Sequence, residues 1–295
     1  TLWKMGNIFQ LSVELYDTKD KKVVWSDRWQ EKWDNLPTIK GSLSDGLLQA
    51  LDTKPKVEQK GDTTNPEAYE FYLKAKHKYA KRKNEDDTEI ARGLLNKAIE
   101  LDDNLTLAKG LLGWTYLGTG EYDKAMDIFS LTLIQTEKLG DMYGMMMSLN
   151  RIGSVYGSKD YYEKALEYFN QSLEIAKELG DKQGIAQSLN NIGSMYKEKD
   201  DLDTALDYHE RSRKIYEELG DKHGMCSIFN NIGIVHSSKG DYDNALDYHG
   251  RSLEIAEKLG DKYGMGKSFN NIGTVYWFRG DYDKALEYYE RSLVI

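Results

Sequence analysis

The sequence predicts a mostly α-helical solenoid of stacked helical hairpins, with a small α/β segment at its N-terminal end. Residues of one type return every 40 positions over more than half of the chain, and such a period is the signature of a repeat architecture. Only the N-terminal end instead alternates apolar and polar residues as strands do. The recurring residues include Asn150, Asn190, Asn230 and Asn270, Gly140, Gly180, Gly220 and Gly260, and Ala125, Ala165, Ala205, Ala245 and Ala285.

The N-terminal segment is predicted to contain a β-hairpin and one helix. Within residues 7–28, Phe9, Leu11, Val13 and Leu15 alternate with polar residues, and "DTKDKK" separates this strand from the return strand "VVWSDRW". A short helix is expected around residues 38–51, followed by a polar linker over residues 52–64. Because a lone hairpin is not stable by itself, we interpret residues 1–51 as the end of a larger α/β domain.

This segment resembles the C-terminal part of TolB-like (FlgO-like) domains. The similar features are the strand "QLSVELYD", the return strand "KKVVWSDRW" and the helix that leads into the linker. In that family "NPEAYEFYLKAKHKY" is the usual opening of a tetratricopeptide repeat (TPR) array, although here Asp20-Lys21 replaces the glycine of the usual turn. The resemblance implies a partial TolB-like segment over residues 1–51.

From residue 65 onward the pattern predicts helical hairpins. Gly180 suits the left-handed position after a helix, and Asp181 suits the N-cap of the next one. Gly240-Asp241 and Gly280-Asp281 separate the two helices of a hairpin in the same way, and Asp200-Asp201 is a degenerate form. We expect six hairpins, the last one truncated, over residues 65–102, 105–139, 141–179, 181–219, 221–259 and 261–295.

A glycine in the middle of each first helix indicates close helix packing. Such a glycine costs roughly 1 kcal/mol relative to alanine, so its repetition is expected only where a partner helix crosses. The spacing Ile152-Gly153…Tyr156 followed by Ala165…Phe169 resembles the TPR signature. The 40-residue length resembles the repeats of Pins-type spindle-orientation adaptors and, more distantly, those of kinesin light chain.

The adjacent amides Asn190 and Asn191 recur in neighbouring repeats and are predicted to face away from the buried side of their helix. In TPR proteins this face lines a concave groove, which implies a peptide or partner-protein ligand. An amide offers a donor and an acceptor together, as a peptide backbone requires. The second asparagine resembles the asparagine ladder of O-GlcNAc transferase, whereas the lysines of the carboxylate clamp are mostly missing. The candidate binding residues are Asn150, Arg151, Gln187, Asn190, Asn191, Lys197, Asn230, Asn231, Lys267, Asn270, Asn271, Trp277 and Phe278. The alternative is a purely structural use, in which one asparagine of each pair fixes the stacking of repeats.

Other features are weaker candidates for function. His209, His249 and His236 replace aromatic residues of the repeat, so core packing is expected rather than a metal site with Cys226. The sequence contains no phosphate-binding loop, metalloprotease helix or nucleophile elbow, and we expect no enzyme activity, no cofactor and no metal. The net charge of −9 argues against nucleic acid as the main partner, and no apolar run reaches membrane-spanning length.

The sequence therefore predicts a non-catalytic scaffold that binds a peptide or partner protein. Two alternatives remain open: a spacer without a ligand, and a regulatory module of a bacterial signalling protein with a nucleotide cyclase, kinase or transcription-regulator part. Because the chain starts at Thr1 and stops within a repeat at Ile295, we interpret it as a cytoplasmic fragment. The apolar end of the last helix, with Leu286 and Leu293, predicts self-association there.

Overall fold

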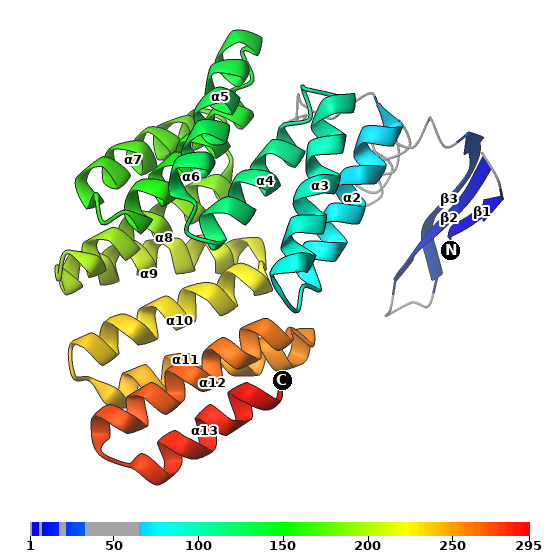
Figure 1. The fold of residues 1–295 in the computed structure, drawn as a ribbon. Helices are drawn as coiled ribbons and strands as arrows, with labels where there is room; N and C mark the ends of the chain where they lie inside the picture. Colours follow the sequence, from blue (N-terminus) through cyan, green and yellow to red (C-terminus); the bar gives the residue numbers. More distant parts are fainter. Residues whose placement is uncertain (1, 6–7, 18–21, 33–64) are drawn as a thin grey trace. The chain divides into compact units, whose positions relative to one another are not determined.

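The computed structural model describes residues 2–5, 8–17, 22–32 and 65–295 (Figure 1). Contacts between Cα atoms divide the chain into two compact units, residues 1–148 and 149–295, which are described separately. The helix predicted over residues 38–51 and the linker over residues 52–64 lie outside the described residues.

The N-terminal strands form an antiparallel sheet in the order β1-β2-β3, with β1 Leu2–Met5, β2 Ile8–Asp17 and β3 Lys22–Lys32. In the β2–β3 pair, Leu11 lies opposite Trp29, and the register shifts between Leu15 and Tyr16. The predicted hairpin is confirmed by this pairing. The sequence did not predict β1, because four residues are too few to show an alternating pattern.

The first unit also contains two helical hairpins, formed by α2 Pro66–Ala80 with α3 Glu85–Leu101 and by α4 Thr106–Gly118 with α5 Tyr122–Leu139. The side chain of Asn65 accepts hydrogen bonds from the first-turn amides of α2, and that of Asn84 caps α3. Ala68, Leu95 and Leu105 are fully buried in a common apolar core.

The buried Arg92 links α3 to the next hairpin. Its guanidinium donates hydrogen bonds to Thr115 and Thr119 and forms an ion pair with Glu121 at 2.8 Å. Lys124, then Thr119 and Arg92, lower the pKa of the Glu121 carboxyl to about 2. With Glu89 bound at Nη1, all three guanidinium nitrogens of this largely buried cation have a partner within the fold, as the burial of a charge requires.

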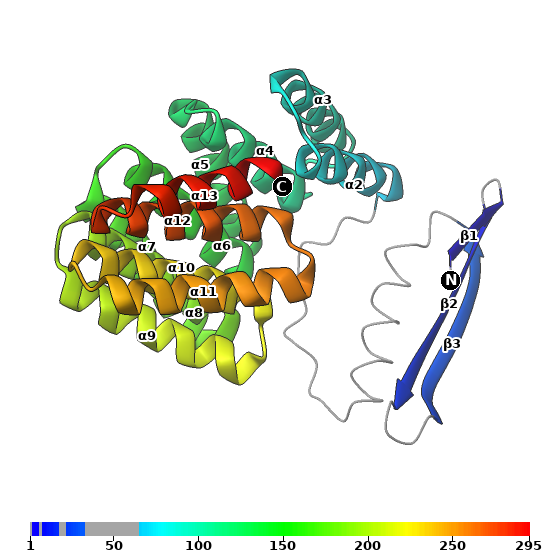
Figure 2. The same cartoon turned by 90° about the horizontal axis from the view of Figure 1, so that it is seen from below.

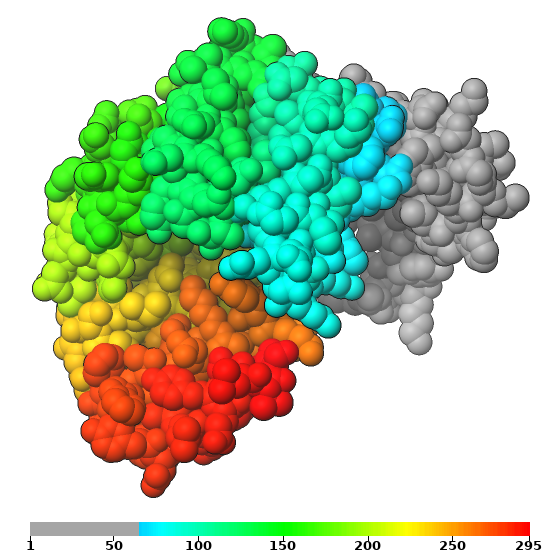
Figure 3. Space-filling view, viewed as in Figure 1, coloured from blue at the N-terminus to red at the C-terminus, as the bar shows by residue number. Residues whose placement is uncertain are grey.

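The second unit continues the hairpins without interruption. Its helices are α6 Met142–Ser158, which crosses the division between the units, α7 Tyr162–Glu178, α8 Lys182–Glu198, α9 Leu202–Leu219, α10 Lys222–Ser238, α11 Tyr242–Leu259, α12 Lys262–Arg279 and α13 Tyr282–Val294. Consecutive helices from α7 to α13 lie side by side (Figures 1 and 2). The side chains of residues 220–295, coloured yellow to red in Figure 3, form one continuous surface. Together with α2–α5, these helices make up six consecutive hairpins among the described residues, as predicted.

The predicted helix ends are confirmed at the connections. Gly220 and Gly260 have φ of 65° and end α9 and α11 in the left-handed conformation that glycine adopts at low cost. Asp221 and Asp261 then cap α10 and α12, since their carboxylates accept from the backbone N–H groups of Gly224 and Gly264.

The mid-helix glycines of the first helices from α4 to α12 make the close approach that the sequence predicts. A Cβ atom added to Gly193 would lie 2.9 Å from the His209 ring and 3.1 Å from the carbonyl oxygen of Ala205. Gly153 and Gly233 meet Phe169 and His249 in the same way. One aromatic or imidazole ring therefore packs on each of these glycines, and His209 and His249 occupy this core position as expected.

The asparagine face of the C-terminal hairpins

A ladder of amide hydrogen bonds joins the first helices of successive hairpins. The Nδ2 atom of Asn191 on α8 donates to Oδ1 of Asn150 on α6 at 2.9 Å. In the same way Asn231 on α10 donates to Asn190 at 2.9 Å, and Asn271 on α12 donates to Asn230 at 3.3 Å. The second asparagine of one repeat thus bonds to the first asparagine of the preceding repeat.

Two of the asparagines at the first position, Asn150 and Asn230, lie deeper than the sequence predicts, whereas Asn190 is half-buried and Asn270 is exposed. Asn150 and Asn230 are only 5% and 1% exposed, and their Nδ2 atoms donate to the buried hydroxyls of Ser188 and Ser268 at 3.5 and 3.2 Å. The expectation that both amides face away from the core is therefore wrong for these two positions. The next hairpin covers these two asparagines. A helical wheel drawn for one repeat cannot predict this burial, because it does not include the neighbouring hairpin.

The second asparagine of each pair is half-buried and has hydrogen-bonding capacity left. Asn191, Asn231 and Asn271 each use one N–H in the ladder. An amide carries two N–H donors and an acceptor oxygen. Asn191 and Asn271 also line two pockets on this side of the hairpins. We call this surface, with Asn191, Asn231, Asn271 and the two pockets, the asparagine face.

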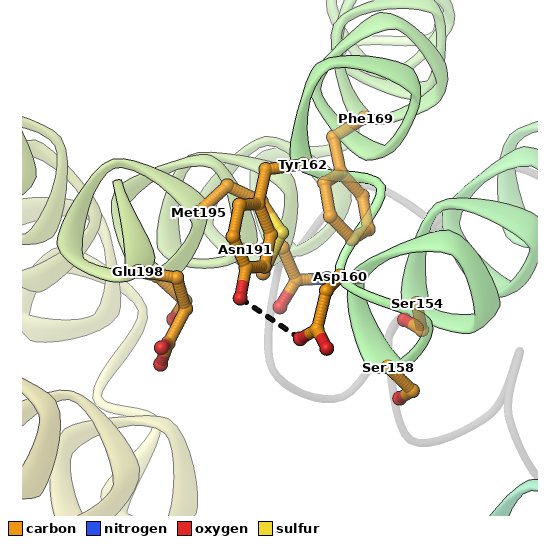
Figure 4. A pocket seen from close by; sticks show the side chains of 10 residues that line it. Ser154, Ser158, Asp160, Tyr162, Phe169, Asn191, Met195 and Glu198 are labelled. Atoms are coloured by element: carbon orange, nitrogen blue, oxygen red, sulfur yellow. Dashed lines mark hydrogen bonds between the residues drawn. The ribbon is translucent and has the colours of Figure 1, made fainter.

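The α6–α8 pocket has a volume of about 380 Å³ and an acidic lining. The Tyr162 hydroxyl donates to the Asp160 carboxylate at 2.8 Å, and this bond, with burial, raises the pKa of Tyr162 (Figure 4). Glu198 supplies the second carboxylate, and Lys197 lies 3.2 Å from it. The full lining consists of Ser154, Gly157, Ser158, Asp160, Tyr162, Phe169, Asn191, Ser194, Met195 and Glu198.

The α10–α12 pocket occupies the same repeat positions 80 residues later. Its volume is about 510 Å³, and its walls include the nearly parallel rings of Tyr242 and Phe278, whose centroids are 6.5 Å apart. His249 takes the place of Phe169, and Gly240 takes the place of Asp160. The full lining consists of Ile234, Ser237, Ser238, Lys239, Gly240, Tyr242, His249, Asn271, Thr274 and Phe278.

The two imidazoles on the core glycines are held neutral by burial. Burial lowers the pKa of His209 to about 4, and burial followed by the nearby charge of Lys267 does the same for His249. His249 bonds through Nδ1 to Oδ1 of Asn230 at 3.0 Å, whereas Nδ1 of His209 is buried without a partner among the described residues. The repeat therefore places the same residue type in two different polar environments.

The remaining predicted site residues are spread over the same unit. Arg151, Gln187 and Lys197 are half-buried, and Lys267 and Asn270 are exposed beside a pocket near the end of α13. Trp277 and Phe278 are 56% and 60% exposed, but only Phe278 is among the residues that line the α10–α12 pocket. Trp277 instead packs edge-on against Tyr282, with the ring centroids 5.0 Å apart.

Several pocket residues at the hairpin turns were not predicted from the sequence. Asp160, Tyr162 and Tyr242 lie at the hairpin turn, and they meet the first helix of the next repeat only in the folded stack. The 40-residue alignment does contain a signal, because Tyr162, Tyr242 and Tyr282 share one repeat position. The shared repeat position did not indicate that the tyrosines would line pockets.

Comparison with known families identifies the repeat. The tetratricopeptide repeat model matches residues 144–218 and 224–295. Both segments are tetratricopeptide repeats. The TPR fold accounts for the crossing glycines and for the aromatic position packed on each of them.

Solved structures share this fold at low sequence identity. The protein BtubC (BKLC) of P. vanneervenii is 22% identical, with a TM-score of 0.54, over 78% of this chain and 90% of that one. A Rap protein in complex with competence and sporulation factor is 15% identical, with a TM-score of 0.62, over 85% and 78%. The STAND signal transduction ATPase of Pyrococcus horikoshii, which has a TPR sensor, is 17% identical, with a TM-score of 0.57, over 81% and 39%.

No curated protein sequence matches the chain. Among the described residues, no helix combines the length and apolar character needed to span a membrane.

Proposed function

We propose that the chain is a non-catalytic scaffold that binds an extended peptide segment of a partner protein on the asparagine face. The observation that carries this proposal is the position of the second asparagines. Asn191 and Asn271 each close a ladder bond with one N–H, are half-buried, and line a pocket. Their remaining donor and acceptor groups match the backbone of an extended peptide in any sequence.

The alternation of asparagines and pockets suits a peptide whose backbone and side chains are bound by different groups. Amides that recur once per repeat hold the backbone, and the pockets between them receive side chains. The α6–α8 pocket is lined by two carboxylates, and the α10–α12 pocket by aromatic and aliphatic groups with Lys239. Different linings at repeated positions give selectivity that a uniform spacer does not require. The Rap protein structure, with its bound factor, is a precedent for ligand binding on this fold.

The test is a selection of peptides on the purified chain from a displayed random library. The triple variant Asn191→Ala, Asn231→Ala, Asn271→Ala is expected to bind the selected peptides at least about tenfold more weakly, because each lost hydrogen bond contributes about 0.5–1.5 kcal/mol. The matched control is Asn170→Ala with Asn244→Ala, two exposed asparagines on second helices. Equal affinity of the triple variant, or no enriched peptide, contradicts the proposal.

A second proposed function is that of a sensor module within a larger bacterial signalling protein. The antiparallel β2–β3 hairpin ahead of the repeats favours it, since this pairing is what a partial TolB-like segment over residues 1–51 requires. The STAND protein is a precedent for a TPR sensor in a signalling chain. The sequence of the complete gene decides between this function and an isolated scaffold.

We also propose that the chain self-associates through α13. Leu286, Leu293 and Val294 on α13 are 59%, 85% and 86% exposed, and apolar side chains that gather at a surface recruit partners. Light scattering of the wild type and of Leu286→Lys with Leu293→Lys tests this. An assembly that dissociates in the double variant is expected, and a monomeric wild type contradicts the proposal.

A further inference from the structure

The α10–α12 pocket contains a buried imidazole whose second nitrogen has no hydrogen-bond partner among the described residues. His249 is 1% exposed and lines the pocket, and its hydrogen bond is made by Nδ1 to Oδ1 of Asn230 at 3.0 Å. The Cε1 side of the ring, with both nitrogens, packs against Gly233 of α10, because a Cβ atom on Gly233 would lie 2.6 Å from Cε1, 2.8 Å from Nδ1 and 2.9 Å from Nε2. Ser237, one turn further along α10, lines the same pocket.

The ladder determines the tautomer of this imidazole. Oδ1 of Asn230 also accepts from Nδ2 of Asn271, so Oδ1 is an acceptor and Nδ1 of His249 carries the hydrogen. Burial lowers the pKa of His249 to about 4, so the ring is neutral at pH 7. A neutral imidazole has one N–H, and Nε2 therefore presents a lone pair as a hydrogen-bond acceptor.

A second polar group of the pocket also has an unused hydrogen bond. Oγ of Ser237 is buried and has no partner among the described residues. Buried hydroxyls normally have a partner, and one left without any costs about 1–3 kcal/mol. A hydroxyl both donates and accepts, so a ligand hydroxyl matches the two lining groups in kind, as a donor to Nε2 of His249 and an acceptor from the O–H of Ser237.

The rest of the pocket is suited to a flat apolar body. The rings of Tyr242 and Phe278 are nearly parallel, at 6°, and Ile234 adds an aliphatic wall. Phe278 is 60% exposed, so the pocket opens at the surface and extends to the buried His249. Aromatic side chains bind such walls by offset or edge packing.

We propose that the α10–α12 pocket binds a tyrosine side chain of the partner, with its ring on Tyr242 and Phe278 and its hydroxyl between His249 Nε2 and Ser237 Oγ. This inference rests on the proposed function, because it names the residue that a bound peptide presents at this position. Phenylalanine lacks the hydroxyl, and tryptophan can donate through its indole N–H but cannot accept from Ser237. Tyrosine satisfies all the groups described.

The test uses the full chain and two small probes, N-acetyl-tyrosinamide and N-acetyl-phenylalaninamide, titrated into the ¹⁵N-labelled protein. The tyrosine probe is expected to shift the signals of Asn271, Thr274 and Phe278 and to bind about fivefold more tightly than the phenylalanine probe. Long-range ¹H–¹⁵N spectra are expected to show His249 protonated at Nδ1 and unprotonated at Nε2.

Variants taken from the chain's own repeats separate the polar contact from packing. His249→Phe places at this position the residue found at 169, and it is expected to reduce the preference for the tyrosine probe to within about twofold. Ser237→Ala is expected to reduce the preference partly. His209→Phe changes the equivalent imidazole of the preceding hairpin and is the control that retains the full preference.

The inference is overturned by equal binding of the two probes to the wild type, by His249 protonated at Nε2, or by loss of the preference in His209→Phe. Absence of any shift at Asn271, Thr274 and Phe278 also overturns it. The proposed function is tested separately, by the binding of library-selected peptides to the wild type and to the triple asparagine variant. Binding of the tyrosine probe without any selected peptide supports the pocket and contradicts peptide binding along the asparagine face.

Discussion

The α6–α8 pocket and the α10–α12 pocket are built from equivalent positions of the repeat, yet their chemistry differs. Asn191 and Tyr162 in the first correspond to Asn271 and Tyr242 in the second. Phe169 corresponds to His249, Asp160 to Gly240, and Glu198 to Phe278. The repeat backbone thus sets where a pocket forms, and a few side chains set what it can bind. Each position at which the two linings differ also provides a substitution that the other pocket already contains.

The largest expected effect concerns the imidazole that only the α10–α12 pocket contains. Burial lowers the pKa of His249 to about 4 from an ordinary 6.5, so below pH 6.5 the unfolded chain takes up a proton that the folded chain excludes. The contribution of the neutral His249 to the free energy of unfolding is complete above pH 6.5 and is lost as the pH falls to 4. The loss is about 3 kcal/mol in the free energy of unfolding.

Urea unfolding of the wild type and of His249→Phe at pH 7 and pH 4 measures this effect. The variant is expected to lose about 3 kcal/mol less than the wild type over this range. Phe169 shows that the repeat accepts phenylalanine at this position. His209→Phe is expected to behave in the same way, since burial also lowers the pKa of His209 to about 4. Equal pH dependence of all three proteins contradicts the prediction.

The next effect concerns the glycine beneath the ring in each pocket. In Gly233→Ala the new methyl group lies 2.6 Å from the His249 ring, and this overpacking is expected to lower the free energy of unfolding by about 2 kcal/mol. Gly153→Ala is expected to cost a similar amount against Phe169. The control is Gly250→Ala in the middle of α11, where no atom lies within 4 Å of the new methyl group. This variant is expected to raise the free energy of unfolding by up to about 1 kcal/mol. Urea unfolding distinguishes the three, and a neutral Gly233→Ala contradicts the close approach.

A smaller effect distinguishes the two ends of the amide ladder. Asn191→Ala removes the donor to Oδ1 of the buried Asn150 and is expected to cost about 1–2 kcal/mol. Asn271→Ala is expected to cost less, because Oδ1 of Asn230 still accepts from Nδ1 of His249. Urea unfolding at pH 7 gives both values. A larger cost for Asn271→Ala reverses the expected order and contradicts this account of the ladder.

The smallest effect concerns the turn beside the α6–α8 pocket. Asp160 and Asp200 both have φ of 61°, where glycine stands in other repeats, so Asp200→Gly is expected to stabilise the fold by up to about 1 kcal/mol. Asp160→Gly is expected to gain less, because it also removes the hydrogen bond from Tyr162. The pKa of Tyr162 is then expected to fall toward 10. An unchanged Tyr162 titration contradicts the bond.

The helices and their ends could be predicted from the sequence because they depend on local physics. Gly260 and Asp261 form a helix stop and a helix cap through contacts within four residues, and the repeat shows each signal several times. The crossing at Gly193 could be predicted as well, since the fixed distance from Gly193 to His209 spans a single hairpin. The β2–β3 hairpin was predicted from its alternation in the same way.

The chemistry of the asparagine face was decided by tertiary structure. Whether an amide is buried depends on the next hairpin, so Asn230 is covered by α12 although a wheel of α10 alone leaves it open. Nδ1 of His249 carries the hydrogen because it donates to Oδ1 of Asn230. That oxygen also accepts from Asn271 of the following repeat, which fixes the orientation of the Asn230 amide. Sequence periodicity identifies equivalent positions, but hydrogen bonds and burial in a stacked repeat come from neighbours about 40 residues away. The two pockets therefore share their place in the sequence pattern and acquire different linings only in the folded stack.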